Sequence, residues 1–200
     1  MTEIVIHPAI ENRPNAFTQA EIGWTPWLQP LDEAELTERH WAGLVDASRA
    51  KSPYFMLLAR DPDILQARTK TDKDIFYNVS AGLPRAEREL AATAASRANG
   101  CIFCASVHSR FASHHSKRTE DVQRLLDEGL QADLGSRWNA VVEASAALTA
   151  TPSQFGADEI RRLREEGLDD LEIADVIHGA AFFNWANRLM LSLGEPTPAA

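Results

Sequence analysis

The chain has 200 residues, of which 44% are hydrophobic and 24% charged, as in ordinary globular proteins, and this composition excludes global disorder. With 20 Lys plus Arg against 29 Asp plus Glu, the formal charge of −9 repels phosphate backbones and anionic lipids, so neither nucleic acid nor a membrane is expected as a partner. The first residues lack a basic segment followed by a long apolar run, and we therefore expect a cytoplasmic protein in a reducing thiol pool.

The first part of the chain predicts an arm followed by one domain. Residues 1–31 contain four prolines and no sustained period, which indicates an extended N-terminal arm. Trp24 and Trp27 are expected to pin this arm onto the rest of the protein. Residues 32–200 are predicted to form one helical domain, whose first helix begins at the capping-box pattern Asp32-x-x-Glu35.

The next helices are marked by prolines and glycines. Ser52-Pro53 and Asp61-Pro62 each place an N-cap residue before a proline at the first helical position. Leu83-Pro84 opens a further helix, and Asn99-Gly100 ends it with residues that tolerate left-handed backbone. A new helix is therefore predicted to begin at or near Cys101.

The remaining helices complete an all-α prediction. Thr119 and Ser136 are predicted as N-caps of two helices, and Asp169-x-x-Glu172 as the cap of a long last helix that Gly194 ends. No segment shows alternating apolar and polar residues between hairpin turns, so no β structure is predicted.

The chain's two cysteines, Cys101 and Cys104, lie three residues apart at the start of a predicted helix. That spacing puts both thiols on one face, close to disulfide reach. Amides at a helix N-terminus stabilise negative charge and lower the pKa of a thiol there. His108 follows Cys104 by four residues on the same face and can accept or return a proton. The pattern indicates thiol chemistry.

Glu89 is the predicted partner of His108. If the helices on either side of Asn99-Gly100 form an antiparallel hairpin, Glu89 and His108 lie about 15 and about 12 Å from the turn and can meet side by side. A carboxylate beside an imidazole orients the ring and raises its basicity.

These residues resemble a known family. The segments Leu83-Pro84-Arg85-Ala86-Glu87-Arg88-Glu89 and Ser96-Arg97-Ala98-Asn99-Gly100-Cys101-Ile102-Phe103-Cys104, followed by His108, are similar to the alkylhydroperoxidase D-like (AhpD-like), peroxidase-related branch of the carboxymuconolactone decarboxylase family. The signature is Glu, eleven residues, Cys-x-x-Cys, three residues and His, and the motif core spans residues 83–130. Phe103 departs from members that carry a histidine at this position.

The resemblance implies an AhpD-like helical bundle, built around the hairpin that carries Cys-x-x-Cys, and a homo-oligomeric peroxidase with antioxidant activity. In such a protein Cys104 attacks the hydroperoxide and becomes a sulfenic acid, and Cys101 resolves it as a disulfide. His108 and Glu89 form the proton relay. The implied partners are a small-molecule hydroperoxide and a lipoyl- or thioredoxin-like dithiol reductant, with no cofactor and no metal.

The last predicted helix also indicates a homo-oligomer, independently of the family resemblance. Its apolar side chains cover most of its circumference, as expected for a helix buried between subunits, and they are interrupted by Asn184, Asn187 and Arg188. The three polar residues are equally consistent with a ligand-lining role.

Other interpretations of the same residues stay open. Two cysteines can be small core residues. Cys101, Cys104 and His108, with His114 or His115, supply enough ligands for tetrahedral zinc, although one continuous helix wraps an ion poorly. The alternative function is therefore a non-catalytic redox-sensing or metal-binding oligomeric module. The wider family also includes cysteine-independent lyases, and the intact cysteine pair argues against that activity.

Overall fold

The computed structural model describes residues 14–78 and 80–199, so residues 1–13 of the predicted arm lie outside the described part. Helices dominate it, as predicted. The α-helices are α1 (Glu38–Leu44), α2 (Pro53–Leu58), α3 (Pro62–Tyr77), α4 (Arg85–Ala98), α5 (Ile102–Ser116), α6 (Thr119–Glu128), α7 (Ser136–Thr149), α8 (Ala157–Glu165) and α9 (Asp170–Leu193). Short 3-10 turns cover Glu33–Glu35 and Ala47–Lys51, and β1 (Gly23–Pro26) pairs with β2 (Gly194–Thr197).

The helix starts at Asp61 and Asp169 follow the predicted capping chemistry. The Asp61 side chain accepts a hydrogen bond from the amide of Ile64 at 3.3 Å, and the Asp169 side chain accepts one from Glu172 at 2.8 Å. The predictions for Thr119 and Ser136 were wrong by one position. Each is the first residue of its helix, because the chain turns into the helix one residue earlier.

The helix predicted from Asp32 is interrupted. The Asp32 amide donates to the Glu35 carboxylate at 2.9 Å, so the capping box forms, but it closes only the turn Glu33–Glu35. Leu36 then adopts extended backbone, and α1 begins after Thr37, whose amide donates to Nδ1 of His40 at 3.0 Å. A second local cap therefore restarts the helix six residues after Asp32.

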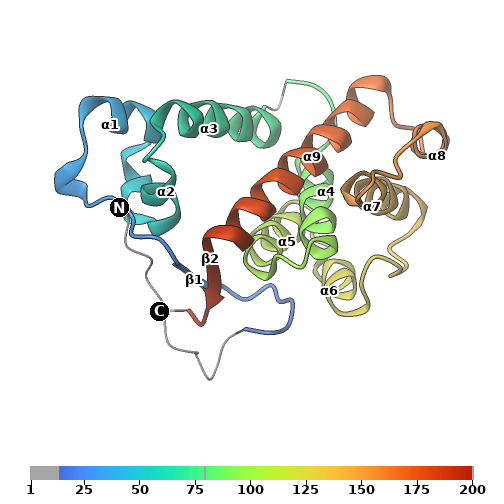
Figure 1. Ribbon diagram of the computed structural model, residues 1–200. Helices are drawn as coiled ribbons and strands as arrows, with labels where there is room; N and C mark the ends of the chain where they lie inside the picture. Colours follow the sequence, from blue (N-terminus) through green and yellow to red (C-terminus); the bar gives the residue numbers. More distant parts are fainter. Residues whose placement is uncertain (1–13, 79, 200) are drawn as a thin grey trace.

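The centre of the fold is the hairpin of α4 and α5, with α9 and α7 packed against α4 (Figure 1). Gly100 makes the turn with φ of +75°, a backbone conformation that glycine adopts without strain. Residues 87–96 of α4 are all buried. The small side chains of this helix, four of them alanines in 91–95, let its neighbours approach from several sides.

A two-stranded antiparallel sheet corrects the prediction of no β structure. β1 in the N-terminal arm pairs with β2, which follows α9, in the register Gly23 with Thr197 and Pro26 with Gly194. The Trp27 amide extends the pairing by donating to the Leu193 carbonyl at 2.7 Å. Two four-residue strands far apart in the sequence, both containing proline, carry no alternating pattern that would reveal the pairing.

Trp24 pins the arm onto α9, as expected. Its indole Nε1 donates to the Met190 carbonyl at 3.4 Å, and its ring packs edge-on against Tyr54 with centroids 5.6 Å apart. Gly194 is required here by close approach, because a Cβ atom at this position would overlap the Trp24 ring.

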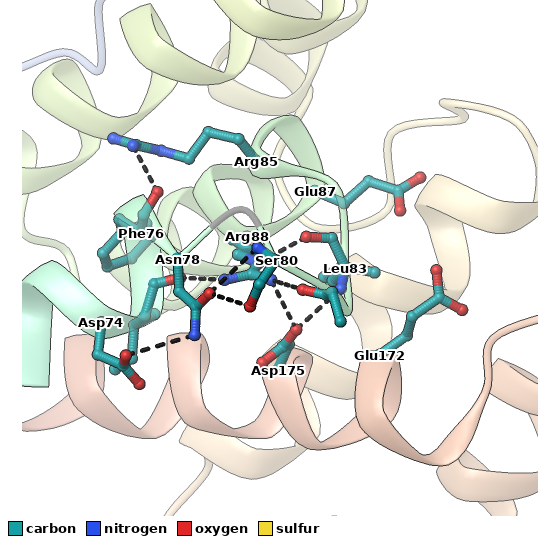
Figure 2. A network of polar contacts seen from close by, with 12 residues as sticks. Asp74, Phe76, Asn78, Ser80, Leu83, Arg85, Glu87, Arg88, Glu172 and Asp175 are labelled. Atoms are coloured by element: carbon teal, nitrogen blue, oxygen red, sulfur yellow. Dashed lines mark hydrogen bonds and ion pairs between the residues drawn. The ribbon is translucent and has the colours of Figure 1, made fainter.

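Arg88 fixes the start of α4, as Figure 2 shows. Its guanidinium donates to the carbonyls of Leu83, Ile75 and Ala81 at 2.5, 2.8 and 2.8 Å, and pairs with Asp175 of α9 at 3.0 Å. One buried side chain thereby joins the end of α3, the connecting loop, α4 and α9. This network sets the position of the beginning of α4, which carries Glu89.

Candidate active site

A cavity with a volume of about 350 Å³ lies between α2, α3, α4, α5 and α9. Cys104 and His108 of α5 and Glu89 of α4 reach it together. Most of the other lining is aromatic or aliphatic: Trp24, Phe55, Phe76, Phe103, Val107, Phe111, Phe183, Ala186 and Met190. A cavity of this size with few polar groups suits a small apolar ligand.

Glu89 and His108 meet as the hairpin geometry predicted. Nδ1 of His108 lies 2.5 Å from Oε2 of Glu89, whose side chain is fully buried. The other carboxylate oxygen accepts a hydrogen bond from Nε of Arg85 at 2.6 Å. An ionised carboxylate can only accept, so Nδ1 carries the proton and Nε2 of His108 is left as the basic nitrogen.

The His108 ring is held in place by two neighbouring aromatic side chains. Its centroid lies 3.9 Å from that of Phe183 and 5.4 Å from that of Phe76. Because the ring cannot turn without displacing these aromatic side chains, the contact with Glu89 and the direction of Nε2 are fixed together.

The two cysteines occupy different positions at the start of α5. Cys101 is the N-cap residue and Cys104 lies on the first turn, and both are buried free thiols. Cys104 lines the larger cavity with His108, whereas Cys101 lines an adjoining cavity of about 70 Å³ that shares Trp24, Phe103 and Met190 with it. The structure therefore brings Cys104, His108 and Glu89 to one cavity and Cys101 to its neighbour.

The hydrogen bond between the two thiols shifts their pKa values in opposite directions. The hydrogen bond from the Cys104 thiol lowers the pKa of Cys101, and the nearby amides of Cys104 and Phe103 act in the same direction, although no regular capping hydrogen bond forms. The same hydrogen bond to Cys101, together with burial, raises the pKa of Cys104 well above its usual range. The first negative charge of the pair therefore resides on Cys101.

Asn187 of α9 is a further polar neighbour of the pair. Its hydrogen bonds lower the pKa of both thiols. The residue is fully buried, accepts a hydrogen bond from Nδ2 of Asn99 at 3.1 Å and donates to the Ser96 hydroxyl at 3.0 Å. Of the three polar residues that interrupt the last helix, this one therefore faces the cysteines.

The zinc interpretation requires a cluster of metal-binding side chains. Within residues 14–78 and 80–199, no group of three or more His, Cys, Asp or Glu side chains is placed to hold a metal ion. His114 and His115 pack edge-on against each other at 5.0 Å near the exposed end of α5, away from the cavity that holds Cys104.

The chain matches the model of the carboxymuconolactone decarboxylase family over residues 62–150, a segment that contains α3 to α7 with the cysteine pair. The matched segment therefore resembles the carboxymuconolactone decarboxylase family. The YdfG protein of Bacillus subtilis strain 168 is 29% identical over 122 residues, which are 60% of this chain and 81% of that protein.

Solved structures show that the fold is AhpD-like. A peroxidase-related protein from Ralstonia eutropha JMP134, described as an alkylhydroperoxidase AhpD core, has a TM-score of 0.68 and 23% identity, covering 82% of this chain and 87% of that one. The debrominase Bmp8 has a TM-score of 0.66 and 15% identity over 82% of this chain and 88% of its own. A cysteine-to-alanine variant of Bmp8 is known in complex with 2,3,4-tribromopyrrole. Proteins described by different reactions therefore share this fold.

No helix within the described ranges combines the length and hydropathy needed to cross a bilayer.

Proposed function

We propose that this protein reduces hydroperoxides through a dithiol–disulfide cycle of Cys101 and Cys104, with Glu89 and His108 as the proton relay. The observation that carries the proposal is the hydrogen-bonded chain from Arg85 through Glu89 to His108, which ends in the same apolar cavity as Cys104. A fixed carboxylate and imidazole beside a thiol are what an activated sulfur nucleophile requires.

The first step converts Cys104 into a nucleophile. Nε2 of His108 takes the Cys104 proton, and the resulting imidazolium is stabilised by Glu89. This transfer overcomes the high pKa that burial and Cys101 impose on the Cys104 thiol. The thiolate attacks the terminal oxygen of the hydroperoxide and the O–O bond breaks. The alkoxide that leaves takes the proton from His108. Sulfur is oxidised by two electrons to the sulfenic acid, and the hydroperoxide is reduced to an alcohol.

The second step closes the disulfide. Cys101, the thiol whose pKa is lowered, attacks the sulfenic sulfur of Cys104. The S–S bond forms, the S–O bond breaks, and the leaving hydroxide takes up the Cys101 proton as water. A dithiol reductant, lipoyl- or thioredoxin-like, then restores both thiols by exchange. The opposite pKa shifts of the two thiols thus support different roles for the two cysteines.

Purified protein supplied with a dithiol reductant is expected to consume cumene hydroperoxide. Cys104→Ser abolishes turnover, and His108→Gln lowers it by about 10²-fold or more. His114→Gln is the matched control, because it changes a histidine on the same helix outside the cavity. Unchanged activity in Cys104→Ser would overturn the proposal.

A second candidate reaction is reductive debromination of a small aromatic compound. The aromatic lining of the cavity favours a ring as ligand, and the Bmp8 variant of similar fold is known in complex with a brominated pyrrole. The cysteine pair can supply the two electrons that replace C–Br by C–H, with release of bromide and formation of the disulfide. Bromide release from 2,3,4-tribromopyrrole, compared with cumene hydroperoxide consumption under the same conditions, decides between the two reactions.

A further inference from the structure

Two polar side chains of the larger cavity carry buried atoms that make no hydrogen bond of good geometry. They are the Tyr54 hydroxyl on α2 and the Nε and Nη1 atoms of Arg68 on α3, and Arg68 lies close enough to lower the pKa of Tyr54. Only 8% of Tyr54 and 9% of Arg68 is exposed. Buried polar atoms are almost always satisfied in folded proteins, so unpaired donors that line a cavity point to a ligand that completes them.

Tyr54 and Arg68 both keep their protons at physiological pH. Burial raises the pKa of Tyr54 to about 12, against the opposing charge of Arg68, so the hydroxyl keeps its proton. Arginine is charged at any physiological pH. The nearest carboxylate, Asp72, lies 3.5 Å from Nη1 of Arg68 and forms an ion pair without a hydrogen bond of good geometry.

The Arg68 guanidinium is held in a fixed orientation. It lies over the rings of Phe55 and Phe182, at 5.4 and 5.2 Å from their centroids. Aromatic faces attract a guanidinium and restrict its side-chain rotamers. The Arg68 side chain is therefore already ordered before a ligand binds, so binding costs little conformational entropy at this residue.

The surroundings leave excess positive charge near Arg68. Asp72 is shared with a second guanidinium, that of Arg49, whose Nη1 is also buried and unpaired. Asp46 also acts on Arg49, but it is exposed and accepts hydrogen bonds from Ser48. One partly buried carboxylate therefore faces two guanidinium groups, which favours an anion as the missing partner.

We propose that Arg68 and Tyr54 form a carboxylate-binding subsite inside the cavity, and that the ligand is a compact apolar molecule carrying one carboxylate. The guanidinium and the hydroxyl can donate hydrogen bonds to the carboxylate oxygens, and the apolar lining of the cavity can contact the rest of the ligand. As a statement about substrates, this rests on the proposed function, under which the substrate class is an aryl or branched alkyl hydroperoxide bearing a carboxylate. As a statement about binding, it stands independently.

The binding test uses a non-oxidising pair of probes. Calorimetric titration of the reduced protein compares 4-isopropylbenzoate with its neutral analogue 4-isopropylbenzamide. We expect the benzoate to bind at least about tenfold more tightly, as a charge-assisted contact requires. Arg68→Met and the isosteric Tyr54→Phe each reduce this preference, and Arg161→Met, which changes an exposed arginine paired with Asp158, leaves it intact. Equal binding of the two probes to the unaltered protein overturns the subsite. An undiminished preference in both cavity variants overturns it too.

The turnover test asks whether the subsite selects substrates. The ratio of kcat/KM for 4-carboxycumene hydroperoxide to that for cumene hydroperoxide is expected to fall about tenfold in Arg68→Met, mainly through KM. A ratio that stays at the unaltered value contradicts selection by Arg68. If neither peroxide is consumed, the proposed reaction fails, and the titration still decides the subsite on its own.

Discussion

Replacing Glu89 by glutamine is the sharpest single perturbation of the relay. The Glu89 carboxylate is fully buried and joins two partners, Arg85 at 2.6 Å and His108 at 2.5 Å. Glutamine keeps the shape but has only one acceptor oxygen. Because Arg85 can only donate, it retains that oxygen, and the amide NH2 group then faces His108.

This reversal changes the tautomer of His108. Nδ1 must become the acceptor, and the ring proton moves to Nε2, which can no longer take the Cys104 proton. General acid–base catalysis contributes about 10²–10⁴-fold, and loss of the correct tautomer removes most of it, so kcat is expected to fall by that factor. The partly buried Arg85 charge also loses its counter-ion, which lowers the free energy of unfolding by up to about 3 kcal/mol.

The assay is consumption of cumene hydroperoxide at saturating dithiol, with thermal unfolding measured on the same samples. Glu87→Gln is the matched control, because Glu87 is also buried on α4 and paired, with Arg137 at 2.9 Å, but lies outside the cavity. It is expected to lose stability and to keep kcat. If Glu89→Gln is folded and turns over at the rate of the unaltered protein, the relay is refuted.

Three further changes test the supporting structure. Asn187→Leu removes hydrogen bonds that lower the pKa of both thiols, so the pH at which thiolate absorbance appears should move upward, and an unmoved titration contradicts this role. Arg88→Met removes the cation paired with Asp175 and the donor of three carbonyls, and should lower the free energy of unfolding by about 3–5 kcal/mol in denaturant titrations; a loss below about 1 kcal/mol would speak against the network. Gly194→Ala forces a Cβ into the Trp24 ring and should cost about 1–3 kcal/mol, measured the same way, whereas no loss would show that the arm is not tightly docked.

The hairpin was predictable because its signals are local. Pro84 sets the beginning of α4, Asn99-Gly100 sets its end, and both act within one turn of the chain. Once the hairpin is given, the distances of Glu89 and His108 from the turn bring them together by helix geometry alone. The side-by-side placement of these two residues therefore follows from the sequence, whereas their catalytic roles remain a proposal.

The rest of the site depends on contacts between distant segments. Arg68 lies on α3, whose sequence gives no sign that this arginine is buried between two aromatic rings. Tyr54 reaches the cavity only because α2 packs beneath the N-terminal arm. Asn187 had a usable signal, a polar residue on a helix that is otherwise apolar, but its direction toward the cysteines is set by how α9 crosses the hairpin.

The order of ionisation of the cysteines also depends on tertiary contacts. A helix N-terminus lowers the pKa of thiols in general, but here the two thiols are hydrogen-bonded to each other. Only one of the two thiols can have a lowered pKa, because a second negative charge beside the first is unfavourable. The pKa of Cys101 is lowered, whereas Cys104 needs His108 to remove its proton.

Trapping the oxidised sulfur tests the central claim most directly. Cys101→Ser protein treated with cumene hydroperoxide and dimedone should carry one dimedone adduct on Cys104 by peptide mass spectrometry, and the unaltered protein should instead form the Cys101–Cys104 disulfide. An adduct that is absent from Cys104 in the variant, or an unaltered protein that stays fully reduced after peroxide treatment, would contradict the cycle.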